Sequence, residues 1–307
     1  MTLIPEVDEL IDLRHRAHAL GLAARHRVAS VLAGLYASVF RGQGMNFEET
    51  REYQPGDEIR YMDWRVTART GSPHLKVFRE ERERAVMLCV DTGAHMRFGT
   101  RGTFKSIQAA RAAALMGWAA STNQDRVGAV LFDGHPDGLR FYPPSRARRS
   151  FWRMLQGLAS AEGAPPAGDE DYLLRALGAL IRVTPTGGLI MLVADLNRDV
   201  AKLEPLLGKL VQRHEVVLLP VDDPADERIP DIGRVVFHAP GGERMEINTT
   251  SQEGRTRYAQ EWSARRRELE RVCGRLGITL IPLSTGGDVQ LTLVEGLKRR
   301  RRGGRGR

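Results

Sequence analysis

Cysteine is scarce in this sequence, and the two that occur, Cys89 and Cys273, lie far apart. A disulfide framework requires several cysteines at short spacing, so these two do not form one. Cys89 falls within a predicted buried strand and Cys273 within a predicted helix. A chain without structural disulfides is typical of a reducing compartment.

Long apolar runs are also missing. Runs such as Leu189–Ala194 are far shorter than the roughly 18 residues that a membrane helix requires. The N-terminus carries Glu6, Asp8, Glu9 and Asp12, where a signal peptide would need positive charge followed by an apolar core. We therefore expect a soluble cytoplasmic protein without membrane insertion.

The usual catalytic motifs form the third absence. The sequence contains no GxSxG nucleophile elbow, no CxxC pair and no GxGxxG turn. The stretch from Gly102 to Ser106 superficially matches a phosphate-binding loop, but Phe104 stands where that loop requires glycine. His214 and Glu215 lack the second histidine at helical spacing that a zinc protease needs. We therefore expect a protein that is not an enzyme.

What the sequence does contain is an apolar strand that ends in a carboxylate. Residues 85–90 are apolar on both faces, which suits the middle of a sheet covered by helices. Asp91 follows at the carboxyl end of this strand, the edge where open α/β sheets place their ligand sites. Residues 188–194 repeat the pattern and end at Asp195.

Strand and helix patterns alternate along the rest of the chain. Helices are expected over 103–122, 145–158, 172–183, 200–212, 252–276 and from Asp288, and strands over 126–132, 139–142, 215–221 and 278–283. Residues 234–238 and 244–248 predict an edge hairpin. This order predicts an α/β fold with a doubly wound, mainly parallel sheet.

The N-terminal part predicts a helix over about the first twenty residues, followed by a small β-rich subdomain. Residues 28–40 favour a hairpin with the extended residues 45–47. The turn signal at 55–57 predicts that residues 59–64 fold back on 51–53. The expected aromatic anchors are Phe47, Tyr53, Tyr61 and Trp64.

Acidic residues near this turn have a local explanation. Asp57 and Asp63 are expected to serve turn chemistry and to pair with Arg60, Arg65 and Arg69.

The same region carries a family resemblance. It rests on Arg51, Tyr53, Gly56, Asp57, Arg60, Asp63, Trp64, Ala68 and Arg69, and on the later Asp91, Met96 and Gly99. Together these resemble the signature of domain-of-unknown-function family 58, and weaker similarity runs over residues 34–297. The resemblance implies a von Willebrand factor type A-like domain over 78–297, preceded by the N-terminal helix and β-rich subdomain over 1–77.

The resemblance also suggests a partner. Genes of this family commonly sit beside those of MoxR-type AAA+ ATPases. It therefore implies a non-enzymatic interaction or adaptor protein that acts with such an ATPase in the assembly or maturation of another complex, through an unknown client protein.

A degenerate metal-ion-dependent adhesion site is a further implication. A von Willebrand type A domain typically binds a divalent cation through Asp-x-Ser-x-Ser, a later Thr and a later Asp. Here Gly93 and His95 replace the serines after Asp91, Asp171 aligns with the Thr, and Asp195 aligns with the last Asp. The resemblance thus favours a fold that needs no cofactor.

Several alternatives stay open at this site. Mg²⁺ or Mn²⁺ held weakly by the three carboxylates would suit a metal-dependent enzyme. His95 as a nitrogen ligand would shift the preference toward Mn²⁺ or Zn²⁺. Without a metal, Arg97 or Arg101 is expected to neutralise the carboxylates.

Positive charge is concentrated at the C-terminus. The chain has a net charge of +8, and seven of these charges come from its last ten residues, Lys298, Arg299, Arg300, Arg301, Arg302, Arg305 and Arg307. The remainder is nearly neutral. Like charges and glycines predict a disordered basic tail over 298–307, and contact with a nucleic acid or another polyanion is the alternative.

Overall fold

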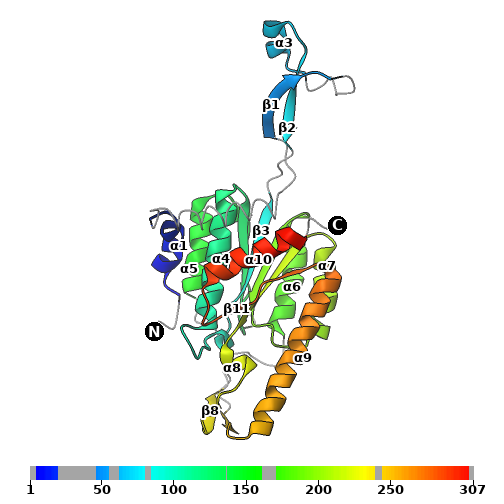
Figure 1. The fold of residues 1–307 in the computed structure, drawn as a ribbon. Coiled ribbons are helices and arrows are strands. Elements are labelled where there is room, and N and C mark those ends of the chain that lie inside the picture. The colour runs from blue at the N-terminus through cyan, green and yellow to red at the C-terminus, as the bar shows by residue number, and fades with distance from the viewer. Residues whose placement is uncertain are drawn as a thin grey trace. The chain divides into compact units, whose positions relative to one another are not determined.

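The structure is a computed structural model that describes residues 5–19, 46–54, 62–79, 84–135, 137–160, 171–238 and 244–303. The chain forms two compact units, a small one of residues 40–84 and a larger body made by the rest (Figure 1). The hairpin predicted from residue 28, and Gly56, Asp57, Arg60 and Tyr61, lie outside the described residues.

The body is built on a doubly wound sheet. Its strands are β3 (Ala85–Asp91), β4 (Arg126–Phe132), β5 (Arg140–Ser145), β6 (Leu189–Ala194), β7 (Glu215–Asp222), β10 (Thr279–Leu280) and β11 (Leu283–Ser284). They lie in the order β5-β4-β3-β6-β7-β10, and β11 also pairs with β7. All pairings are parallel except that of β5 with β4.

This strand order confirms the predicted fold class. Counted along the chain from β3, it is the 3-2-1-4-5-6 order of doubly wound folds, and the direction of winding reverses between β3 and β6. The strand predicted over 278–283 is divided in two, and the break includes Pro282, which has no N–H to donate to a ladder.

Helices cover both faces of the sheet (Figure 1). Those of the body are α1 (Val7–Ala19), α4 (Lys105–Thr122), α5 (Arg148–Ala159), α6 (Tyr172–Val183), α7 (Glu204–Val211), α8 (Pro224–Glu227), α9 (Gln252–Leu276) and α10 (Val289–Gly303), with short 3-10 turns η2 (Ala94–Met96) and η3 (Val200–Lys202). The sheet, α6, α7 and α9 share one apolar core. Helix α4 packs on β3 and β4, with α1, α5 and α10 beside it. No described helix is both long and apolar enough to span a membrane.

Helix α1 belongs to the body, which corrects the predicted division at residue 77. Leu10 is fully buried, and its carbonyl accepts a hydrogen bond from Trp118 Nε1 at 3.0 Å. Glu9 accepts a hydrogen bond from Arg111 Nε on α4 at 2.6 Å. The apolar stripe of this helix therefore buries against α4 and α5 rather than within the β-rich unit.

The small unit pairs β1 (Asn46–Glu52) with β2 (His74–Arg79) in antiparallel fashion and contains α3 (Trp64–Thr70). Of the segment 59–64 expected to fold back on 51–53, the structure describes residues 62–64. Met62 bridges to Leu75 of β2, Trp64 begins α3, and the strand that pairs with β1 is β2. Asp63 Oδ1 accepts from the amides of Arg65 and Val66 at 3.1 and 3.2 Å, and Gly71 ends the helix at φ 76°. The turn chemistry expected of Asp63 is thus an N-cap.

Helix α10 corrects the expectation of a disordered tail from residue 298. Leu293 and Leu297 are fully buried, so the apolar face of the helix carries the basic run as far as Gly303. Arg300 forms an ion pair with Glu215 and donates to Thr279 Oγ1 at 2.5 Å.

Candidate functional site

Asp91 is the first of several carboxylates at the carboxyl edge of the sheet. It is buried, and one oxygen accepts a hydrogen bond from the Gly93 amide at 3.0 Å. The other lies 3.0 Å from His95 Nε2. The Asp91 carboxylate raises the pKa of His95, and this effect outweighs burial, which acts to lower it. A Cβ at Gly93 would lie 2.7 Å from the His95 ring, so glycine leaves room for this pair.

Asp171 has a local structural role. Its carboxylate caps α6 by accepting from the amide of Leu173 at 3.1 Å. The same oxygen lies 2.8 Å from Arg198 Nη1. The second predicted ligand is therefore already bonded to a cation of the chain.

Asp195 directly follows β6 and meets an unexpected partner. The ammonium of Lys105, the first residue of α4, lies 2.7 Å from Asp195 Oδ2 and 2.7 Å from Asp226 Oδ2. The side chain of Lys105 is only 2% exposed. Burial alone would lower its pKa, but Asp195 and Asp226 outweigh burial and raise that pKa. Lys105 is therefore a fully charged ammonium bridging two carboxylates.

The two carboxylates respond differently to this ammonium. Burial alone would raise the pKa of Asp195, yet Lys105 and the Asn197 amide bring that pKa below its ordinary value. At Asp226 burial outweighs Lys105, and the pKa is raised.

Two more carboxylates lie at the carboxyl end of β7, Asp222 as its last residue and Asp223 directly after it. Asp223 is buried and accepts from the amide and hydroxyl of Thr100 at 2.8 and 2.5 Å and from Thr285 Oγ1 at 2.5 Å. Burial alone would raise its pKa, but these hydrogen bonds lower it. Its amide donates to Asp226 Oδ2 at 2.7 Å, which completes a capping box on α8.

Asp222 forms an ion pair with Arg266 of α9. Burial raises its pKa to about 6, against the opposing effect of Arg266. The guanidinium of Arg266 also lies 5.1 Å from the centre of the Trp262 ring, which holds it over the end of β7.

These residues do not fit a divalent cation. Asp91, Asp171 and Asp195 are each bonded to a different basic side chain, and Gly93 and His95 supply no hydroxyl oxygen. Across the described part of the chain, no three His, Cys, Asp or Glu side chains gather as a ligand set. The three carboxylates are paired with His95, Arg198 and Lys105, and not with Arg97 or Arg101 as the sequence suggested.

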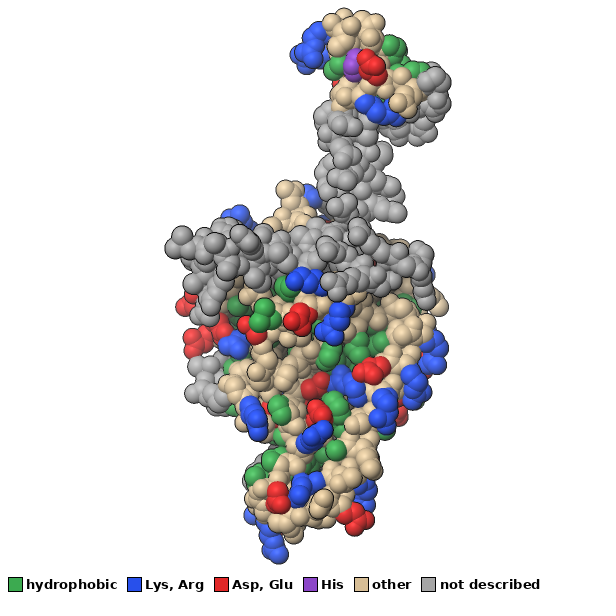
Figure 2. Space-filling view, viewed as in Figure 1, with side chains coloured by type: hydrophobic (Ala, Val, Ile, Leu, Met, Phe, Trp, Pro, Cys, Tyr) green, Lys and Arg blue, Asp and Glu red, His purple; other side chains and the backbone are tan. Residues whose placement is uncertain are grey.

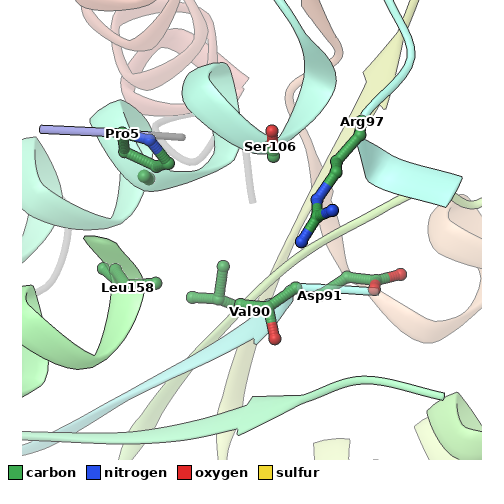
Figure 3. Close-up of a pocket in the computed structure, with 8 residues that line it drawn as sticks. Pro5, Val90, Asp91, Arg97, Ser106 and Leu158 are labelled. Atoms are coloured by element: carbon green, nitrogen blue, oxygen red, sulfur yellow. The ribbon is translucent and has the colours of Figure 1, made fainter. Parts of the chain in front are cut away.

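Arg97 instead lines a small cavity beside Asp91 (Figure 3). The cavity has a volume of about 10 Å³, close to the lower limit for one water molecule. Ser106 Oγ also lines it and is buried without a hydrogen-bond partner in the structure as described. This cavity therefore has room for no organic ligand.

Sequence reasoning missed Lys105, Asp222, Asp223 and Asp226. A signal was present for the last two, because Asp223-Pro224-Ala225-Asp226 after a strand is a helix-start pattern with a capping box. Nothing local marks Lys105, whose main partner is 90 residues away in the chain.

The small unit contains most of the family signature. Trp64 is 67% exposed, so the prediction that it anchors the subdomain is wrong. Arg65 and Arg69 are also exposed, and α3 buries none of its residues. We use the name α3 face for the exposed side chains Trp64, Arg65 and Arg69 together, of which Trp64 projects from a different side of this seven-residue helix than the two arginines.

Two other signature residues lie in or after β1. The Tyr53 amide donates to Pro73 O at 2.9 Å, and Arg51 Nη1 donates to Glu52 O at 3.0 Å. Both therefore contribute to local structure.

Among the basic C-terminal residues whose side chains the structure describes, Lys298 and Arg299 are exposed and Arg300 is half-buried. Lys298 and Arg299 lie on α10, Arg300 is paired with Glu215, and Arg301 and Arg302 continue the helix. Arg305 and Arg307 lie outside the described residues. Figure 2 shows acidic and basic side chains interspersed over the visible face of the body.

Comparison with protein families and known proteins places the chain. The model of the family described as "Protein of unknown function DUF58" matches residues 49–268. An uncharacterized protein of Mycobacterium tuberculosis is 32% identical over 284 residues, which cover 92% of this chain and 88% of that protein.

Solved structures with a similar fold include an aerotolerance-related membrane protein from Bacteroides fragilis, at 14% identity and a TM-score of 0.41. That match covers 72% of this chain and 99% of the other. A von Willebrand factor type A protein from Catenulispora acidiphila has 11% identity and a TM-score of 0.39, covering 73% of this chain and 43% of the other. At such scores the fold assignment depends on the strand order itself.

Proposed function

This chain belongs to the DUF58 family, and on that premise we propose that it is a non-enzymatic interaction protein. Its proposed partner is a MoxR-type AAA+ ATPase, with which it acts in assembling or maturing another protein complex. The resemblance suggests the ATPase, and the α3 face is the observation that supports a binding role.

The α3 face has the composition of a binding surface. Trp and Arg are the residues most enriched among those that dominate binding energy at interfaces. Trp64 is the most exposed large apolar side chain of the described residues, and Arg65 and Arg69 lie on the same short helix. Because α3 buries none of its residues, packing within the unit does not explain this tryptophan.

The sheet edge argues against the alternative of a metal-dependent enzyme. Catalysis by Asp91, Asp171 and Asp195 would require carboxylates free to hold Mg²⁺ or Mn²⁺. All three are occupied by basic side chains of the chain itself. A protein-binding function is therefore better supported than metal-assisted hydrolysis.

Affinity capture tests the proposal. The purified chain is immobilised and exposed to the MoxR-type ATPase with and without ATP, alongside the Trp64→Ala and Trp152→Ala variants. Trp152 is a matched control because it is 45% exposed and lies on α5 of the body. We expect wild type and Trp152→Ala to retain the ATPase and Trp64→Ala to bind about 30-fold more weakly, as for a loss of about 2 kcal/mol.

Two results would contradict parts of this proposal. If wild type neither binds the ATPase nor changes its turnover, the proposed partner is wrong. If Trp64→Ala binds as tightly as wild type, the partner is right and the α3 face is not the surface used. Hydrolysis of phosphoesters by wild type with added Mn²⁺ would instead support the enzymatic alternative.

A further inference from the structure

A buried ammonium lies among the carboxylates that follow β6 and β7. Lys105 Nζ is 2.7 Å from both Asp195 and Asp226, whose side chains are 20% and 13% exposed. The ring of Phe98 lies 5.6 Å from the same nitrogen. Lys105 is therefore enclosed by anionic oxygens on two sides and an aromatic face on another.

The position of Lys105 runs against the preference of its own helix. It is the first residue of the 18-residue helix α4, where the helix dipole favours negative charge. The first turn contains no acidic residue, and the N-cap position is Phe104, without a side-chain cap. The charge at this position is stabilised by carboxylates that arrive from other parts of the sheet.

The geometry resembles that of a bound cation. Two carboxylates point at one centre of positive charge, and one of them, Asp195, aligns with the final metal-binding aspartate of a von Willebrand type A site. Mg²⁺ is commonly held by one or two carboxylates and several waters. Two carboxylates that face each other repel unless a cation or a proton lies between them, and here the Lys105 ammonium is that cation.

We infer that the Lys105 ammonium takes the place of the divalent cation at this edge, so that the wild-type site is independent of metal and becomes a divalent-cation site once the ammonium is removed. The inference does not depend on the proposed function. It concerns the chemistry of the sheet edge, whereas the ATPase partnership is argued from α3.

Melting experiments with the full chain test the inference. Wild type, Lys105→Ala and Lys209→Ala are melted with EDTA and with 10 mM Mn²⁺, and Lys209 serves as control because it is exposed on α7. We expect Mn²⁺ to leave the Tm of wild type and of Lys209→Ala unchanged. It should raise the Tm of Lys105→Ala by about 2–4 °C once its concentration exceeds the Kd several-fold, and Asp195→Asn in the same chain should abolish the rise.

If Lys105→Ala folds and its Tm is the same with EDTA and with Mn²⁺, the inference is overturned. If that variant folds only when Mn²⁺ is present, the inference is supported. Should it fail to fold under either condition, equilibrium dialysis of wild type against Mn²⁺ decides. No bound Mn²⁺ is then expected, and binding that is lost in Asp195→Asn would show that the wild-type site takes a metal despite its lysine.

Discussion

Replacing Lys105 by methionine removes the ammonium but keeps a side chain of similar length. Asp195 and Asp226 each lose a charge-assisted bond of 2.7 Å and then face one another without a cation. Removing one partner of a buried ion pair costs about 3–5 kcal/mol. Because the two carboxylates keep some contact with water, we expect the lower end, about 3 kcal/mol at pH 7.

The effect should depend on pH with a definite sign. In wild type the lowered pKa of Asp195 contributes stability that is present above its ordinary value of 3.8 and is lost as the pH falls through its native value. In Lys105→Met the two carboxylates take up protons at higher pH than in wild type, which relieves their repulsion. The difference in the free energy of unfolding between wild type and Lys105→Met should therefore become smaller as the pH is lowered from 7 to 4.

Urea denaturation at both pH values measures this difference. Lys209→Met, an exposed lysine on α7, should change stability by less than about 0.5 kcal/mol. Adding Asp195→Asn and Asp226→Asn to Lys105→Met should recover most of the loss, because no unpaired charge then remains. If Lys105→Met is as stable as wild type at pH 7, the bridging role of the ammonium is refuted.

Three further predictions concern other parts of the chain. Because Leu10 is fully buried, Leu10→Ala should destabilise the body by about 2–5 kcal/mol in urea denaturation. Asp12→Ala on the exposed side of the same helix should cost less than about 0.5 kcal/mol. Equal losses of stability in the two variants would contradict the packing of α1 on the body. Because the pKa of Asp222 is raised to about 6 in the folded protein, the free energy of unfolding should fall by up to about 3 kcal/mol as the pH rises from 4 to 7. Asp222→Asn should lack this dependence of stability on pH. Trp64→Ala should leave Tm within about 1 °C of wild type, because α3 buries none of its residues; a large decrease would mean that Trp64 is structural.

The fold was predictable because its signals are local. Runs apolar on both faces mark β3 and β6 as central strands, and the structure buries every residue of both. Asp91 ends β3 and Asp195 directly follows β6, and because these neighbouring strands are parallel, both residues lie at the same edge of the sheet. Alternation of strand and helix patterns then gave the doubly wound arrangement.

The ion pairs of the site were not predictable from local sequence. Lys105 lies in the stretch from Gly102 to Ser106, which matches a phosphate-binding loop only superficially. The order of the strands in the sheet is what brings the start of α4 to the ends of β6 and β7. Arg97 and Arg101 were expected to pair with the carboxylates because they are close to Asp91 in the sequence, but the residues that pair with the carboxylates are His95, Arg198 and Lys105. Helix α3 was missed because Asp63 and Gly71, which bracket it, were not recognised as helix-cap signals.

The claim that the Lys105 ammonium takes the place of a divalent cation is tested most directly by a crystal structure from crystals grown in 10 mM MnCl₂, with anomalous data collected for manganese. We predict continuous density for the Lys105 ammonium between Asp195 and Asp226, and no anomalous peak beside either carboxylate. An anomalous peak within metal–oxygen bonding distance of Asp195, with the Lys105 side chain turned away, would contradict the account.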